Sequence, residues 1–221
     1  MGPAFARFPL WRDAVDRRPW FDSLTAAGVE SILVLDSNAF LANRWRQGSF
    51  VPGLRFWNVR FPDARFIQAG NEPDGTGDAS SRQTRARYRR LIREVREVWP
   101  AATVIAGGLV GIRFEYFDGL AVAGAHVAAF HPYAQTGDSV QDLVAQIRQH
   151  TNLPLWATEF GTDVIPDPHE RAVWFTEMLI GLWQAGTEVA CVHRYDDDGS
   201  GFSVAGTESE AAILDAIPGV A

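Results

Sequence analysis

The sequence lacks lysine altogether, so all 20 of its basic residues are arginine. An imine between protein and substrate requires a lysine amine, and a Walker-type phosphate loop requires a Gly-Lys pair, so both chemistries are excluded. Cysteine is almost absent too. The one cysteine, Cys191, permits no internal disulfide, and its apolar neighbours indicate an unreactive core residue.

Positive charge and long apolar runs are also missing. The formal net charge is -7, whereas a protein that binds nucleic-acid phosphates is normally basic. The apolar runs are far shorter than the roughly 20 residues of a membrane helix, and no signal-like apolar region opens the chain. We therefore expect neither nucleic acid nor a membrane as a partner. The predicted protein is soluble, either cytoplasmic or secreted with its signal removed.

The chain has the length and apolar content of one α/β domain that covers residues 1–221. Of its residues, 47% are apolar, and no linker, repeat or low-complexity tract divides it. Short apolar runs alternate with helical patterns, which predicts a parallel barrel or a doubly wound sheet. The expected strands lie near 31–35, 66–72, 103–107, 125–130, 155–159 and 188–195; the expected helices lie near 10–27, 52–61, 81–99, 112–122, 139–149, 168–186 and 208–217.

The segment FIQAGNEPD, residues 66–74, is a short apolar run that ends in polar residues. Pro73 disfavours helical geometry for the residue before it, so we expect Glu72 to remain extended at the strand end. Because side chains alternate along a strand, Glu72 should share a face with Gln68, while Asn71 takes the other face. A carboxyl group on a stiff strand end is a good candidate for proton transfer.

A second carboxyl group, Glu159, ends the similar run LWATEFG at residues 155–161. Together with the Asn-Glu-Pro at 71–73 and the AFHPY at 129–133, this segment resembles the large clan of retaining glycoside hydrolases, clan A. In that clan an Asn-Glu-Pro ends strand four of a (β/α)8 barrel, and a Glu ends strand seven. The resemblance covers the chain from about residue 31 onwards. It implies a TIM-type (β/α) barrel fold.

The resemblance also implies roles for four residues. Glu72 corresponds to the acid/base of the clan and Glu159 to its nucleophile. Asn71 corresponds to the asparagine that bonds the sugar 2-hydroxyl, and Tyr133 to the tyrosine that contacts the nucleophile. The alternative interpretation treats both glutamates as ordinary polar strand ends that are bonded to arginine.

Four further polar residues at strand ends are expected to bind substrate. His131 either lines the sugar site or is a satisfied core histidine. His193 and Tyr195 are candidates for the position where the clan usually has a tryptophan platform, and Asp36 follows the strand at 31–35.

No cofactor is expected, because no motif indicates a nucleotide or a flavin. A metal site would have to use His131, His193, Glu72 and Asp196. No pair of histidines in the sequence has the spacing of metal ligands, so we predict no metal.

The front of the chain is short for this fold. A complete barrel typically takes about 250 residues. If residues 31–35 are the third strand, only 30 residues precede it, and a single βαβ unit takes about that many. The barrel is therefore reduced, has a strand within Ala4 to Phe8, or is completed by another copy. We expect a compact or incomplete barrel of about six to eight strands, whose first 30 residues cover the gap, as a monomer or a homodimer.

Two functions remain in view. The first is a retaining glycoside hydrolase that cleaves β-glycosidic bonds of an oligo- or polysaccharide, with its carboxyl groups about 5 to 5.5 Å apart. In that case Glu72 should be protonated near the working pH while Glu159 is ionised. The second is a catalytically silent barrel that binds carbohydrate or another partner. The two glutamates favour the first function, and the short front favours the second.

Overall fold

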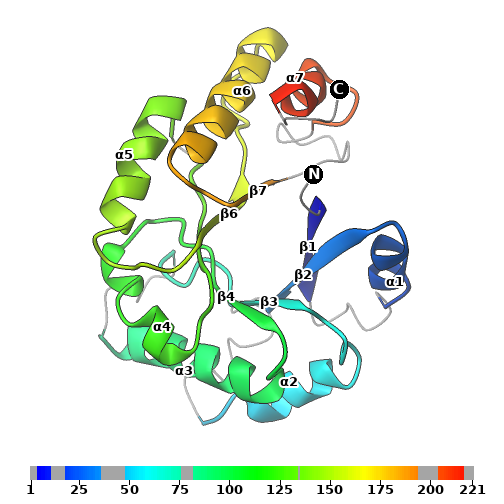
Figure 1. Ribbon diagram of the computed structural model, residues 1–221, viewed down its shortest axis with the longest axis vertical. Helices are drawn as coiled ribbons and strands as arrows, with labels where there is room; N and C mark the ends of the chain where they lie inside the picture. Colours follow the sequence, from blue (N-terminus) through cyan, green and yellow to red (C-terminus); the bar gives the residue numbers. More distant parts are fainter. Residues whose placement is uncertain are drawn as a thin grey trace.

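The computed structural model describes residues 4–10, 18–35, 48–75, 82–133, 135–193 and 204–216. Over these residues strands and helices alternate along the chain (Figure 1). The strands are β1 (Ala4–Leu10), β2 (Val29–Leu35), β3 (Phe66–Ala69), β4 (Thr103–Ala106), β5 (Ala128–Phe130), β6 (Leu155–Phe160) and β7 (Val189–Val192). The helices are α1 (Arg18–Ala26), α2 (Val51–Asn58), α3 (Arg82–Val98), α4 (Leu120–Ala123), α5 (Gly137–Ile147), α6 (Pro168–Gln184) and α7 (Glu208–Ala216), with a 3-10 turn η2 (Phe114–Tyr116).

The strands form one parallel barrel. Two sheets, with the orders β1-β2-β3-β4 and β5-β6-β7, contain only parallel pairs. Parallel bridges between Ile105 and Val127 and between Leu109 and Phe130 join β4 to β5. On the other side β1 lies beside β7, and the helices surround the strands (Figure 1). The predicted (β/α) barrel is therefore confirmed, with seven strands among the described residues.

An apolar cluster fills part of the barrel interior. Phe5 of β1 connects the two sheets, since its ring centroid lies 5.1 Å from that of Phe66 on β3 and 5.0 Å from that of Trp156 on β6. The cluster consists of Ile32, Val34, Ile105, Val127, Ala129, Trp156 and Cys191, with Phe5, Phe66 and Val189 packed against it. A larger cluster lies between the strands and the helices. The closed end of the barrel is thus a packed core that supports the polar residues above it.

The first described residues supply the strand that closes the front of the barrel. β1 pairs with β2 over seven residues, from Ala4 opposite Val29 to Leu10 opposite Leu35. Of the three solutions predicted for the short front, a strand near Ala4 to Phe8 is therefore confirmed. The predicted helix from residue 10 was wrong at its start, because Leu10 ends β1 and α1 begins at Arg18. The period-two burial of Phe8 and Leu10 is the signal of a strand.

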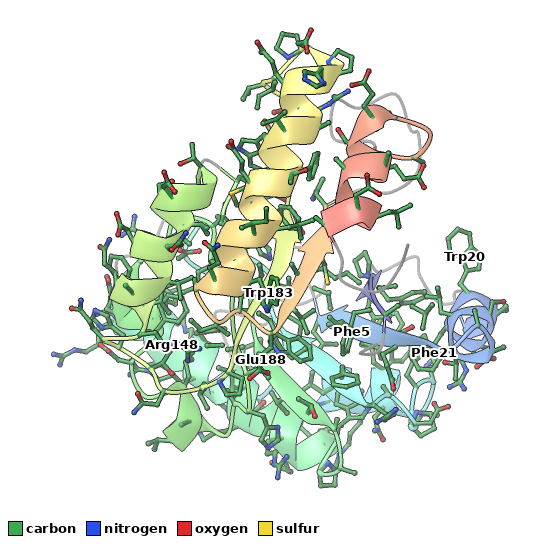
Figure 2. The ribbon with its side chains drawn as sticks, turned by 45° about the horizontal axis from the view of Figure 1, so that its top comes forward. Phe5, Trp20, Phe21, Arg148, Trp183 and Glu188 are labelled. Carbon is green, nitrogen blue, oxygen red and sulfur yellow. The ribbon has the colours of Figure 1, made fainter. Side chains whose placement is uncertain are left out.

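Helix α1 covers this front strand with one face. Phe21 is buried and contacts the ring of Phe8, whereas its neighbour Trp20 is 72% exposed and projects away from the barrel (Figure 2). The predicted helix over 112–122 was also wrong. It is broken into η2 and α4 by Gly119, whose φ of 68° is left-handed. Among the described helices, none combines the length and apolar character needed to cross a membrane.

Candidate active site

The carboxyl ends of β3, β5, β6 and β7 bring most of the predicted site residues together. Glu72, His131 and Glu159 each offer a nitrogen or oxygen within 4.8 Å of the others. Asn71, Tyr133 and His193 are connected to the same group by hydrogen bonds. Two predicted substrate-binding residues, Asp36 and Tyr195, lie outside the described residues.

Glu72 does not have the extended geometry that the sequence predicts. β3 ends at Ala69, Gly70 turns the chain with a φ of 88°, and Glu72 itself has a φ of 46°. A non-glycine residue in this region typically costs about 1–3 kcal/mol and needs support from its surroundings. The support is a hydrogen bond of 2.9 Å from the Glu72 amide to the Gly108 carbonyl oxygen, in the loop after β4. The prediction was wrong because this tertiary bond overrides the local preference before Pro73.

The loop that carries Glu72 is fixed a second time through Asp74. This buried carboxylate accepts hydrogen bonds from the amides of Val110 at 3.0 Å and Arg113 at 3.3 Å. Burial raises the pKa of Asp74, while the two amide donors oppose that rise. The loops after β3 and β4 therefore form one bonded unit beneath Glu72.

Gly107 and Gly108 allow the close packing around this unit. A Cβ atom on Gly107 would lie 2.7 Å from the Gly70 carbonyl oxygen. A Cβ atom on Gly108 would lie 1.9 Å from Nε2 of His131. Both distances are far below normal contact, so only glycine fits here. These two glycines were not among the predicted site residues, although a Gly-Gly pair directly after a strand is a signal of close backbone approach.

His131 connects the two halves of the site. Its Nδ1 lies 3.0 Å from Oε1 of Glu72, and its Nε2 lies 3.2 Å from the hydroxyl oxygen of Thr158. Burial lowers the pKa of His131 to about 4, so the imidazole is neutral at neutral pH. The neutral ring satisfies both bonds when Nδ1–H donates to Glu72 and Nε2 accepts from Thr158.

His131 is buried and hydrogen-bonded on both sides of its ring. The residue is 1% exposed, and its two ring nitrogens contact Glu72 and Thr158, so its role in lining the sugar site stays a prediction. Its hydrogen bond is the main reason that the pKa of Glu72 is lowered, although burial opposes that shift. The contacts of Glu72 therefore oppose the expectation that it is protonated near the working pH.

Glu159 reaches the site because β6 contains a bulge. Ala157 pairs with Ala190, but Phe160 pairs with Val192, so β6 has one residue more than β7 between these pairs. A bulge re-aims side chains that would otherwise alternate. As a result the two consecutive residues Thr158 and Glu159 both face the site, the first bonding His131 and the second bonding His193.

Arg7 of β1 is a site residue that the sequence analysis missed. Its guanidinium forms an ion pair with the Glu159 carboxylate, and its Nη2 donates to Oδ1 of Asn71 at 2.8 Å. The Gln68 amide lies 3.4 Å from the same Oδ1. Both donors therefore hold the Asn71 side chain through its Oδ1 atom. The available signal was an arginine inside the alternating apolar segment AFARFPL.

Tyr133 and His193 complete the surroundings of Glu159. The amide of His193 donates to the Phe160 carbonyl oxygen at 2.8 Å, which places its ring at the end of β6. Nδ1 of His193 lies 2.6 Å from Oε1 of Glu159 and 2.7 Å from the Tyr133 hydroxyl oxygen. His193 thus links Tyr133 to Glu159, and a direct contact of Tyr133 with the nucleophile stays a prediction.

The cluster of Glu72, His131 and Glu159 also has the spacing of a metal site. Its atoms are already satisfied, however, because His131 bonds Glu72 and the cationic Arg7 pairs with Glu159. A guanidinium beside the carboxylates opposes a second cation. Over the described part of the chain the cluster therefore fits a hydrogen-bonded network better than a metal centre.

Comparisons with known proteins agree with this architecture. The family model described as glycosyl hydrolase catalytic core matches residues 56–199, which include both glutamates. No curated protein matches the sequence.

Several solved structures share the fold. An exo-β-1,4-mannosidase from an Opitutaceae bacterium has a TM-score of 0.64 and 16% identity, over 85% of this chain and 45% of the mannosidase. An endoglucanase has a TM-score of 0.75 and 13% identity, over 96% of this chain and 84% of that protein. An endo-β-1,3-glucanase from Sorangium cellulosum has a TM-score of 0.64 and 16% identity, over 94% and 89% of the two chains. The chain thus spans less than half of the mannosidase but most of the two glucanases.

Proposed function

The chain belongs to the glycosyl hydrolase catalytic core family, and on that premise we propose that it hydrolyses β-glycosidic bonds of an oligo- or polysaccharide with retention of anomeric configuration. The observation that carries the proposal is the pairing of two carboxylates at the barrel mouth, each held by a different partner. Glu72 is bonded by neutral His131, and Glu159 is bonded by Arg7 and His193.

The distance between the glutamates supports retention. Oxygen atoms of Glu72 and Glu159 lie within 4.8 Å of each other. Retaining enzymes have carboxyl groups about 5 to 5.5 Å apart, whereas inverting enzymes need about 6.5 to 9.5 Å to admit a water molecule between them. This spacing is too short to admit a water molecule between the carboxyl groups. It is the spacing expected when one glutamate attacks the sugar directly and forms a covalent intermediate.

The partners of each carboxylate support a division of roles. Glu159 forms an ion pair with Arg7, and we assign it the role of the nucleophile. In the first step a Glu159 oxygen forms a bond to the anomeric carbon, the glycosidic bond breaks, and Glu72 gives its proton to the leaving oxygen. In the second step Glu72 takes a proton from water, whose oxygen displaces Glu159 from the sugar.

The lowered pKa of Glu72 predicts an acidic working range. The acid form of Glu72 is needed for the first step, and its population falls as the pH rises through the lowered pKa. The dependence of kcat/KM on pH should then have its basic limb at acidic pH in the free enzyme. A substrate that displaces the His131 hydrogen bond or excludes water would raise this pKa in the complex.

Substrate contacts are proposed from the surrounding polar groups. The resemblance assigns Asn71 to the sugar 2-hydroxyl, and Tyr133 and His193 border the nucleophile. Asp36 and Tyr195, which the sequence places at strand ends, stay predicted as further substrate contacts. Because the similar solved structures include an exo-β-1,4-mannosidase and an endo-β-1,3-glucanase, β-linked mannans and glucans are the first substrates to test.

The test is a screen of aryl β-glycosides and β-glycans with the wild type and Glu159→Gln. We expect hydrolysis by the wild type, near-total loss in the variant, and a β-configured first product by proton NMR. An α-configured first product would contradict retention. Glycan binding without hydrolysis by the wild type would support the silent barrel instead.

A further inference from the structure

His193 is placed to act on Glu159 directly. Its Nδ1 lies 2.6 Å from a Glu159 oxygen, in the short range of charge-assisted hydrogen bonds. The ring is fixed from two sides. Its backbone amide is bonded to Phe160, and the Tyr133 hydroxyl oxygen lies 2.7 Å from the same Nδ1. The imidazole therefore has one orientation relative to the carboxylate.

The position of one proton follows from these contacts. Glu159 is paired with Arg7 and is a carboxylate, so its oxygens only accept hydrogen bonds. A contact of 2.6 Å between this oxygen and Nδ1 requires that Nδ1 carries the hydrogen. The Tyr133 oxygen then accepts the same hydrogen in a bifurcated bond. The phenolic hydrogen of Tyr133 therefore does not point towards Nδ1.

Both oxygens of Glu159 consequently have a donor. His193 lies on Oε1, and Arg7 lies on Oε2. The carboxylate is held against rotation about its terminal bond, with its remaining lone pairs available to the cleft. When an ester forms between Glu159 and a sugar, the charge that both donors stabilise disappears. When the ester breaks, that charge returns.

We propose that His193 is a positioning residue that holds Glu159 through Nδ1–H and stabilises its carboxylate as the leaving group of the second step. This proposal rests on the function proposed above. Removing the donor should slow release of the sugar from Glu159 more than formation of the ester. A merely structural role of His193 would instead lower the rates of both steps together.

The kinetic test uses an aryl β-glycoside with a good leaving group, for which breakdown of the ester limits the rate. His193→Ala should lower kcat roughly tenfold to a hundredfold, the usual effect of losing one charge-assisted hydrogen bond. KM should fall as well, because the covalent intermediate accumulates. His193→Asn, whose amide nitrogen can replace Nδ1–H, should remain within about threefold of the wild type. His169→Ala, at an exposed position on α6, controls for loss of a histidine elsewhere.

Two kinetic outcomes would overturn the proposal. One is an unchanged kcat in His193→Ala, and the other is a loss in His193→Asn equal to that in His193→Ala. If the wild type hydrolyses no glycoside, the proposed function fails, and a second measurement still decides the role of His193.

That measurement is nitrogen-15 NMR of the histidine rings in the wild type and in Glu159→Gln. We expect neutral His193 to carry its proton on Nδ1 in the wild type and to lose this preference in the variant. Protonation on Nε2 alone in the wild type would mean that Nδ1 accepts from Tyr133, which contradicts the proposal.

Discussion

The two glutamates come from different halves of the barrel, and each is held by a residue of the opposite half. Glu72 follows β3 in the four-stranded sheet, but its partner His131 follows β5 in the three-stranded sheet. Glu159 lies on β6 in the three-stranded sheet, but its partner Arg7 lies on β1 in the other sheet. These two crossed contacts tie the sheets together above the apolar core, where the site needs fixed geometry.

Arg7 and His131 differ in charge, so the two glutamates have different electrostatic environments. Arg7 is permanently cationic and forms an ion pair with Glu159. His131 is neutral and buried, so it donates to Glu72 without a full charge. The side chain of Glu72 is also more exposed, at 30% against 9% for Glu159. Glu159 therefore lies buried beside a cation, whereas Glu72 is more accessible to water.

The largest expected effect comes from substituting the two glutamates in turn. Glu159→Gln should lower kcat by roughly 10⁴-fold or more, because a nucleophile has no substitute. Glu72→Gln should lower it by roughly 10² to 10⁴-fold with a poor leaving group, which needs a proton, and by less with an activated aryl leaving group. Steady-state kinetics on matched aryl glycosides measures both effects. Equal losses that do not depend on the leaving group would contradict the assigned roles.

The sequence predicts which residues form this site better than it predicts the contacts between them. Asn71, Glu72 and Glu159 end apolar runs, and parallel strands bring such ends together. The left-handed geometry of Glu72 was not predictable from local preference, since it depends on a bond to Gly108. The bulge in β6 depends on pairing with β7, which no single strand reveals.

Arg7 shows why the front of the barrel was the hardest part to interpret. Its segment is short, and its arginine acquires meaning only when β1 closes the barrel beside β7. The alternation of Phe8 and Leu10 was visible, but a helical pattern through residues 10–27 competed with it. Long-range closure decided between these interpretations.

A second prediction concerns the pH dependence of stability through His131. Burial lowers its pKa from 6.5 to about 4, so between these values the unfolded state binds a proton that the folded state does not. Stability should therefore fall as the pH falls through this window, by on the order of 3 kcal/mol, and this contribution should be constant below about pH 4. Urea unfolding at several pH values measures it.

The variant His131→Asn sharpens that measurement, because its amide can donate to Glu72 but does not titrate. The loss of stability between pH 6.5 and 4 should become smaller in this variant. His169→Asn, at an exposed position, is the matched control. An unchanged pH dependence in His131→Asn would show that His131 is not the group responsible.

The smallest expected effect is a change in the pH dependence of kcat/KM when His131 is replaced. His131→Leu removes the donor that lowers the pKa of Glu72, whereas His131→Asn retains a donor. In His131→Leu the basic limb of kcat/KM should move to higher pH, since the acid form of Glu72 persists further. The shift is limited because the charge of Arg7 still lowers the pKa of Glu72. In His131→Asn the limb should stay near its wild-type position. An unchanged limb, or a shift to lower pH, in His131→Leu would show that the His131 hydrogen bond does not control the pKa of Glu72.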